Sequence, residues 1–164
     1  MLNAPGCRME EAGMLEYFVF KKEDVSNFYY QLVFLMEMVL KDNILQSYPD
    51  TLPIDYVNNL SVYIEDGSAY IVGAKDGESL AGFSWAYELK IFNEKRFHID
   101  MICVDPGYRK KGIAGKFVKL QIDEAKRRGI KSLEAMATRG NENAYHWFHS
   151  LGFEDERVKV KLEI

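Results

Sequence analysis

The feature that most restricts the fold is one segment, residues 102–115, where an apolar run meets Asp-Pro-Gly and continues through two further glycines into a helical pattern. Ile102–Val104 is typical of the end of a strand, and the apolar spacing after Lys110 predicts a helix that reaches Arg128 and is closed by Gly129. A strand that turns through glycines into a helix gathers backbone N–H groups at the positive end of the helix dipole. The segment therefore predicts a binding site for an anion such as phosphate.

Two well-known phosphate-binding loops do not match this segment. Gly112 is followed by Ile-Ala and not by Lys-Ser or Lys-Thr, so the segment is not a P-loop. A dinucleotide-binding loop belongs to a strand-helix-strand unit, whereas the strand before Asp105 continues a series of neighbouring strands. On its own, the glycine spacing predicts an anion-binding site but does not indicate which anion binds there.

The remaining pattern predicts an α+β domain. The chain has 164 residues, of which 48% are hydrophobic, enough for one domain with an ordinary core that spans residues 1–164. Three runs rich in β-branched and aromatic residues are separated by turn sequences, which is typical of an antiparallel meander. We expect a central mixed β-sheet flanked by helices, with strands at 15–20, 69–75, 80–90, 96–104, 131–137 and 157–164, and helices at 25–40, 54–65, 110–128 and 141–150.

Charge is distributed unevenly along the chain. The whole sequence carries a net charge of −4, yet residues 107–131 hold nine bases and two acids, which leaves −11 for the rest. Cations on the outer face of a helix are ordinary, and this accounts for Lys119, Lys126 and Arg128. Cations at a helix start oppose the dipole, so Arg109 and its two neighbouring lysines indicate a negative ligand there. The small net charge argues against nucleic acid as a partner.

The two cysteines and the apolar runs indicate the cellular compartment to expect. Cys7 and Cys103 are far apart and lie in no metal-binding spacing, so we expect no metal site and a reducing, cytoplasmic environment. The first thirteen residues do not resemble a secretory signal. The most apolar stretch, Phe28–Leu40, is too short to cross a bilayer and contains Gln31, so no membrane association is expected.

Two ordered motifs resemble the signatures of the GNAT N-acetyltransferases. The spacing Arg109-x-x-Gly112-x-Ala114 is similar to their R/Q-x-x-G-x-G/A signature. The second match starts at Asn141-x-x-Ala144 and continues through Trp-Phe to Leu-Gly-Phe, similar to N-x-x-A-x-x-F-Y-x-x-x-G-F. The resemblance covers about residues 69–153 well, and the N-terminal third only by its order of elements. It implies the GNAT acyl-CoA N-acyltransferase fold and acetyl-CoA as the acetyl donor.

The resemblance also assigns contacts to that donor. The pyrophosphate would lie on the backbone N–H groups from Arg109 to Gly115, and the pantetheine arm would pair with the strand edge as an added strand does. Asn141 would contact the cofactor arm, although it also suits the N-cap of the next helix, and one residue can do both. Cys103 is expected to be a small buried residue and not a nucleophile, because this family transfers the acetyl group directly to the amine. The cofactor-binding residues implied are Ile102, Cys103, Val104, Arg109, Lys110, Lys111, Gly112, Ile113, Ala114, Gly115, Asn141 and Phe148.

Direct transfer to an amine requires a general base, for which there are three candidates. His98 and Asp100 are two residues apart on one strand, so they face the same side. Histidine titrates near neutrality, and a neighbouring carboxylate strengthens it as a base. Counted from Val104, His98 is at the position of the catalytic glutamate of some histone acetyltransferases. Glu88 on the preceding strand is the third candidate, as a base through water or as an anchor for a cationic substrate. A strand histidine held by a neighbour is the structural alternative.

The sequence departs from the family at the residue expected to protonate the leaving thiolate. The tyrosine of the second signature is replaced by Phe148, whose ring has no proton to donate. Phe148 would then pack against the cofactor arm, and the proton would come from water or from Tyr145, which can equally be a core residue.

The amine that accepts the acetyl group is the part of the reaction that the sequence determines least. The −11 outside residues 107–131 favours a cationic amine, and we expect a small-molecule amine acceptor. An acyl-CoA-binding regulatory module with little turnover, suggested by Phe148, and a protein or peptide N-acetyltransferase are the alternatives. The resemblance and the open sheet edge after the final expected strand favour a homodimer.

Overall fold

The computed structural model describes residues 14–43, 47–162 and 164 of the chain. Cys7 and the N-terminal segment assessed above lie outside the described residues. The described elements are strands β1 (Glu16–Val19), β2 (Tyr70–Asp76), β3 (Ser79–Ile91), β4 (Glu94–Val104) and β5 (Ser132–Ala135), helices α1 (Lys22–Asn27), α2 (Tyr29–Asn43), α3 (Leu52–Glu65), α4 (Ile113–Arg127) and α5 (Glu142–Ser150), and the 3₁₀ turn Pro106–Tyr108.

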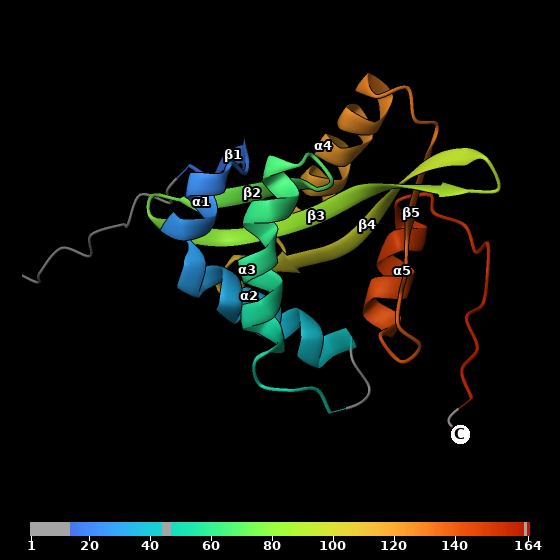
Figure 1. The fold of residues 1–164 in the computed structure, drawn as a ribbon, viewed down its shortest axis with the longest axis horizontal. Coiled ribbons are helices and arrows are strands. Elements are labelled where there is room, and N and C mark those ends of the chain that lie inside the picture. The colour runs from blue at the N-terminus through green and yellow to red at the C-terminus, as the bar shows by residue number, and fades with distance from the viewer. Residues whose placement is uncertain (1–13, 44–46, 163) are drawn as a thin grey trace, which may run out of the picture.

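The strands form one mixed sheet in the order β1-β2-β3-β4-β5. The first four are antiparallel to their neighbours, and β5 runs parallel to β4. Helices α1, α2 and α3 lie on one side of this sheet and α4 on the other, while α5 lies beside β5 (Figure 1). The sequence prediction of an α+β fold with a central mixed sheet and flanking helices is confirmed.

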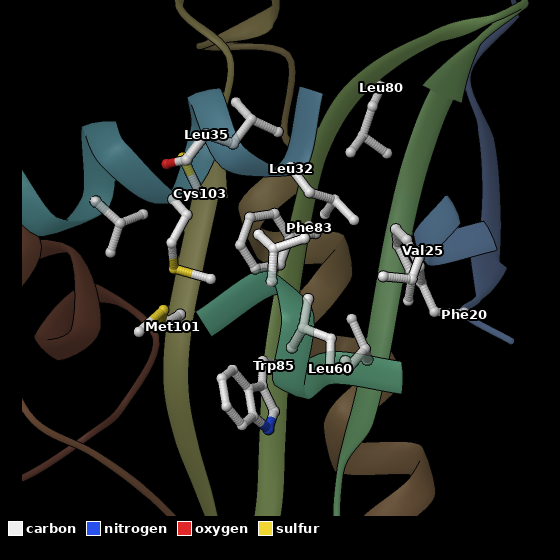
Figure 2. Close-up of a cluster of buried hydrophobic side chains, with 14 of the residues drawn as sticks. Phe20, Val25, Leu32, Leu35, Leu60, Leu80, Phe83, Trp85, Met101 and Cys103 are labelled. Atoms are coloured by element: carbon white, nitrogen blue, oxygen red, sulfur yellow. The ribbon is translucent and has the colours of Figure 1, made fainter. Parts of the chain in front are cut away.

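The two faces of the sheet have separate cores. On the α1–α3 side, Phe83, Trp85, Met101 and Cys103 of β3 and β4 pack among buried residues of the helices (Figure 2). On the α4 side, Ile113 and Phe117 pack against β2 and β3, and further along Ala125 packs with Phe97 and Ala86. The alternation of side chains along β3 and β4 thus decides which residues each helix layer covers.

Three sequence predictions about elements are wrong in detail. The helix expected over residues 25–40 is two helices, which meet at Phe28, where φ is −105° and ψ is 16°. Helix α4 starts at Ile113 and not at Lys110, because Lys110 and Gly112 have φ values of 63° and 77°, which no right-handed helix contains. The final strand expected over residues 157–164 is absent among the described residues of that segment, which have no strand beside them to supply backbone partners.

The helices are short compared with a bilayer. Within the described ranges, none is both long enough and apolar enough to cross a membrane.

Candidate active site

The turn between β4 and α4 presents backbone N–H groups to open space. The Asp105 side chain accepts a hydrogen bond from the Gly107 N–H at 2.8 Å, which fixes the 3₁₀ turn. Gly112 then adopts the left-handed conformation that glycine tolerates, and α4 begins at the next residue. A Cβ added at Gly112 or Gly115 would meet no described atom within 4 Å. The first N–H groups of α4, which have no acceptor within the helix, therefore face a space that an anion can enter.

The cations of this turn are exposed, and their side chains lie along the protein surface. Arg109 donates from Nε to the Val104 carbonyl at 3.1 Å. The Lys111 ammonium lies 4.9 Å from the centre of the Tyr108 ring, and the Lys116 ammonium lies 5.8 Å from that of Tyr17. These contacts hold positive charge around the start of α4 without pairing it to a carboxylate.

The cations further along α4 are paired with acids, except Lys126, which makes no ion pair within the described residues. Lys119 bonds to Asp123 at 3.0 Å, and Arg127 and Arg128 both bond to Glu124. The two arginines hold the pKa of Glu124 at about 2, against the opposing effect of its own partial burial. Positive charge that is not neutralised within the helix is thus concentrated at its start.

Beyond Ile99, the edge of β4 has no strand beside it in the part of the chain that the structure describes. Strand β5 pairs with β4 only from Arg96 to Ile99, which leaves residues 100–104 at an open edge that leads to the glycine turn. The Cys103 thiol does not lie at this edge, because its Sγ points into the core and donates to the Leu35 carbonyl at 3.2 Å. Burial raises the pKa of Cys103 to about 12, so this thiol is protonated at neutral pH.

His98 is buried and held by a residue that the sequence prediction missed. Its exposed fraction is 3%, its ring centre lies 5.1 Å from that of Tyr87, and its Nδ1 lies 2.9 Å from Oε1 of Glu134. Because an ionised carboxylate can only accept, we assign the ring proton to Nδ1. Nε2 has no hydrogen-bond partner among the described residues.

Glu134 is itself fixed from behind by Arg96. The Arg96 Nη1 donates to Oε2 of Glu134 at 3.1 Å, and the same guanidinium contacts Glu94 and Glu156. His98 and Glu134 lie at matching positions of the parallel strands β4 and β5. The two side chains meet because of the register in which β4 and β5 pair. No motif in the sequence indicates that register.

Asp100 lies at an irregularity of β4, on the same side as His98. The register passes from Ile99 opposite Ala86 to Met101 opposite Trp85, so Asp100 is an extra residue in the strand, as in a β-bulge. Burial raises the pKa of Asp100, and the nearby His98 partly offsets this. Asp100 in turn contributes to the raised pKa values of Tyr56 and Tyr87, after the larger effect of their own burial.

The structure does not bring Glu88 to this group. Glu88 lies opposite Phe97, on the α4 side of the sheet, and its carboxylate bonds to Arg128 at 2.9 Å and contacts Lys95 at 3.8 Å. The side chain of His98, one residue further along β4, projects from the other face. Glu88 therefore ties α4 to the sheet, and sequence alone could not assign its face relative to His98.

The second motif spans α5 together with the residues at both of its ends. Asn141 caps this helix, with Oδ1 accepting from the Ala144 N–H at 3.2 Å and Nδ2 donating to Asn43 of α2 at 3.1 Å. The Tyr145 hydroxyl donates to Asp155 at 2.8 Å, and no hydrogen bond joins it to His98 or Asp100 in the described structure. The Phe148 ring packs on Phe153, with centres 5.1 Å apart.

The arrangement is suited to moving a proton beside an extended ligand. A buried imidazole with one nitrogen held by a carboxylate and the other unpartnered can accept a proton at Nε2. The open β4 edge and the glycine turn lie next to it in sequence and can hold an extended arm that ends in phosphate. No cluster of three or more metal-ligating side chains occurs in the described part of the chain.

Comparison with known proteins relates the chain to acetyltransferases. The family model described as "Acetyltransferase (GNAT) family" matches residues 33–153. No protein of curated function matches the sequence.

Several solved structures share the fold at low sequence identity. An aminoglycoside acetyltransferase from an uncultured soil metagenomic sample has a TM-score of 0.70 at 18% identity, covering 92% of this chain and 96% of its own. A predicted acetyltransferase with acetyl-CoA from Clostridium acetobutylicum gives 0.72 at 17% identity, with coverages of 92% and 96%. A ribosomal-protein-alanine N-acetyltransferase from Brucella melitensis biovar Abortus 2308 gives 0.68 at 21%, with coverages of 92% and 99%.

Proposed function

Because the chain belongs to the GNAT acetyltransferase family, we propose that it transfers the acetyl group of acetyl-CoA directly to a primary amine of a small molecule. The observation that carries the proposal is the edge of β4, which β5 leaves open from Asp100 to Val104 and which leads straight to the glycine turn of α4. An extended arm with a pyrophosphate at one end fits an open strand edge followed by a helix N-terminus.

The donor would be held mainly by main-chain groups. The N–H groups between Arg109 and Gly115 would bind the pyrophosphate, with the exposed lysines of the turn supplying positive charge. The edge at Ile102, Cys103 and Val104 would pair with the amide groups of the pantetheine arm. The neighbour from Clostridium acetobutylicum, solved with acetyl-CoA, supports this choice of donor.

His98 is the proposed general base. Its Nε2 takes a proton from the substrate ammonium, directly or through one water, while Nδ1–H remains bonded to Glu134. The amine lone pair then attacks the thioester carbonyl, the C–N bond forms, and the C–S bond breaks. The thiolate takes its proton from water, which in turn receives the second proton that the nitrogen loses as the amide forms. Phe148 has no proton to donate, and the Tyr145 hydroxyl is bonded to Asp155.

The test has a binding arm and a turnover arm. Acetyl-CoA should raise the Tm of the full chain, because a ligand that binds only the folded state stabilises it. A panel of small amines should then release free CoA, measured with a thiol reagent, and peptides should release none. Absence of a Tm shift would contradict donor binding, and turnover on peptides alone would contradict the small-molecule acceptor.

A specific observation also favours a second candidate, an acyl-CoA-binding module with little turnover. Neither Phe148 nor Tyr145 offers a free hydroxyl to the leaving thiolate in this structure. Such a module would show the same Tm shift with acetyl-CoA and no release of CoA with any amine. The two arms of the experiment therefore separate the two functions.

A further inference from the structure

Aromatic side chains gather around Asp100 on the α3 side of the sheet. Tyr56 and Tyr63 of α3 pack on Trp85 of β3, with ring centres 6.3 Å and 5.5 Å apart. Two residues further along β3, Tyr87 stacks on His98. Asp100 lies opposite the step between Trp85 and Ala86, where β4 carries its extra residue. The Asp100 carboxylate thus lies at a position on the sheet that is bordered by tyrosine, tryptophan and histidine rings.

Two buried polar atoms on this face have no partner in the described structure. They are Nε1 of Trp85, a residue only 7% exposed, and Nε2 of His98. In Figure 2 the indole nitrogen lies at the end of the Trp85 ring that is turned away from Phe83 and Leu80, in the direction in which β3 continues to Tyr87. Buried N–H and ring nitrogen atoms are usually hydrogen-bonded in native proteins, so two unpartnered ones on one face indicate a position where a polar ligand can bind.

The charge at this site also lacks a partner. Within the described residues, the Asp100 carboxylate makes no ion pair and no hydrogen bond, although it is half-buried. A half-buried carboxylate is favoured by a cation close to it, and a cation over aromatic faces gains further from the negative ring surfaces. The chemistry that fits is an ammonium group.

We propose that Asp100, Tyr56, Trp85 and Tyr87 form the acceptor subsite, and that it selects amines whose ammonium is carried on an aromatic or apolar body. Asp100 binds the ammonium, the aromatic rings cover the body, and Nε2 of His98 faces the nitrogen that reacts. The identification of the ligand as an acceptor rests on the proposed function. A heavily hydroxylated amine is disfavoured, because the rings offer few hydrogen-bond partners to replace water on its hydroxyl groups.

The chain offers a direct optical test, since Trp85 and Trp147 are its two tryptophans. The variant Trp147→Phe leaves Trp85 as the single emitter, and it is titrated with 2-phenylethylamine, 2-phenylethanol and glucosamine. We expect the amine to change the Trp85 emission with a half-saturation at least about ten-fold below those of the other two. Unchanged emission, or equal half-saturation for all three compounds, overturns the proposal. Calorimetric titration of the wild-type chain gives the same comparison without the substitution.

A second pair of variants tests the carboxylate. Asp100→Asn should raise the half-saturation for 2-phenylethylamine by about ten-fold and leave that for 2-phenylethanol unchanged. Asp123→Asn, which removes an exposed carboxylate on the far side of α4, is the matched control and should change neither. Equal effects of the two substitutions would contradict the role of Asp100.

Different outcomes contradict the acceptor subsite and the transferase activity. Binding of 2-phenylethylamine without CoA release would leave the subsite standing and contradict the transferase activity. Release of CoA with glucosamine as efficiently as with 2-phenylethylamine would leave the activity standing and contradict the subsite.

Discussion

A single ring nitrogen illustrates how this site depends on contacts between side chains that are distant in sequence. His98 is separated from Glu134 by 36 residues, yet their contact decides which nitrogen of the imidazole carries the proton. Arg96 donates a hydrogen bond to the second oxygen of the same carboxylate, which holds Glu134 in place. The nitrogen of His98 left to act as a base is therefore the buried Nε2, which has no partner in the part of the chain that the structure describes.

Replacing the base should abolish most of the activity. For His98→Gln we expect kcat/KM for the best amine to fall by about 10²–10⁴, because general base catalysis is typically of that size. The limb of the pH profile that rises with pH should disappear with it. The Tm shift with acetyl-CoA should remain, since the donor contacts lie beyond residue 100. An unchanged kcat/KM and pH profile would remove His98 from the mechanism.

Glu134 should act as a positioning residue. Glu134→Gln keeps the shape of the side chain but offers Nδ1 a weaker, uncharged acceptor, so we expect kcat to fall by about ten-fold with little change in KM for the amine. Glu134→Asp should restore part of the lost kcat, because it keeps a carboxylate on this side chain. A purely structural role would instead lower Tm and leave the kcat of the folded enzyme unchanged.

At the scale of elements, the sequence pattern predicted most strands and helices, and the errors have physical causes. The three strands of the meander and helix α3 appear near their predicted positions, because alternation and helical spacing are local properties. The prediction of a final strand is wrong for the described residues of 157–164, because a strand needs a neighbouring strand to pair with and alternation in the sequence does not show whether one is there. The break between α1 and α2 at Phe28 interrupts a run of apolar residues whose spacing is typical of one continuous helix.

The candidate site was predictable only where it depends on spacing within one element. His98 and Asp100 project from the same side of β4, as a separation of two residues indicates, although a bulge shifts the register between them and Met101. The partner Glu134 and the opposite placement of Glu88 depend on strand register and on which face each helix covers. These are properties of the assembled sheet, which no local pattern contains. The roles of these residues in the reaction stay predictions.

The glycine turn allows a matched test of donor binding. Gly112 and Gly129 flank α4 with φ values of 77° and 71°, and a Cβ at either position meets nothing within 4 Å in the described structure. Each Gly→Ala substitution should therefore cost about 1–2 kcal/mol of backbone strain. Only Gly112→Ala places a methyl group before the N–H groups at the start of α4. We expect it to reduce the acetyl-CoA-induced Tm shift and Gly129→Ala to preserve that shift. Equal shifts in both variants would place the pyrophosphate elsewhere.

At the scale of the whole molecule, the two faces of the sheet carry different groups of functional side chains. The α4 side combines the glycine turn, the proposed anion site, with a network in which Glu124 and Glu88 hold Arg128 between helix and sheet. The α1–α3 side carries the aromatic rings, Asp100 and His98. Strand β4 is the element common to both, and we propose that its edge binds the donor and its α3-facing side chains bind the acceptor.

The network on the α4 side should make folding stability depend on pH in a defined window. The pKa of Glu124 is lowered from 4.5 to about 2 by Arg127 and Arg128 in the folded chain. A lowered folded-state pKa stabilises the fold above the unfolded-state value, and this contribution is lost as the pH falls from 4.5 towards 2. At pH 7, Glu124→Gln should therefore reduce the free energy of unfolding by about 1–2 kcal/mol, a size expected for charged hydrogen bonds near the surface.

The pH dependence of that difference is the decisive measurement. Urea unfolding of the wild-type chain and of Glu124→Gln, followed by circular dichroism from pH 7 downwards, should give curves whose separation shrinks below about pH 4.5. Asp123→Asn is the control, because its ion pair with Lys119 is exposed and should contribute less than about 0.5 kcal/mol at any pH. If the separation for Glu124→Gln stayed constant into acid, Glu124 would stabilise the chain through packing, and its ion pairs with Arg127 and Arg128 would contribute nothing to folding.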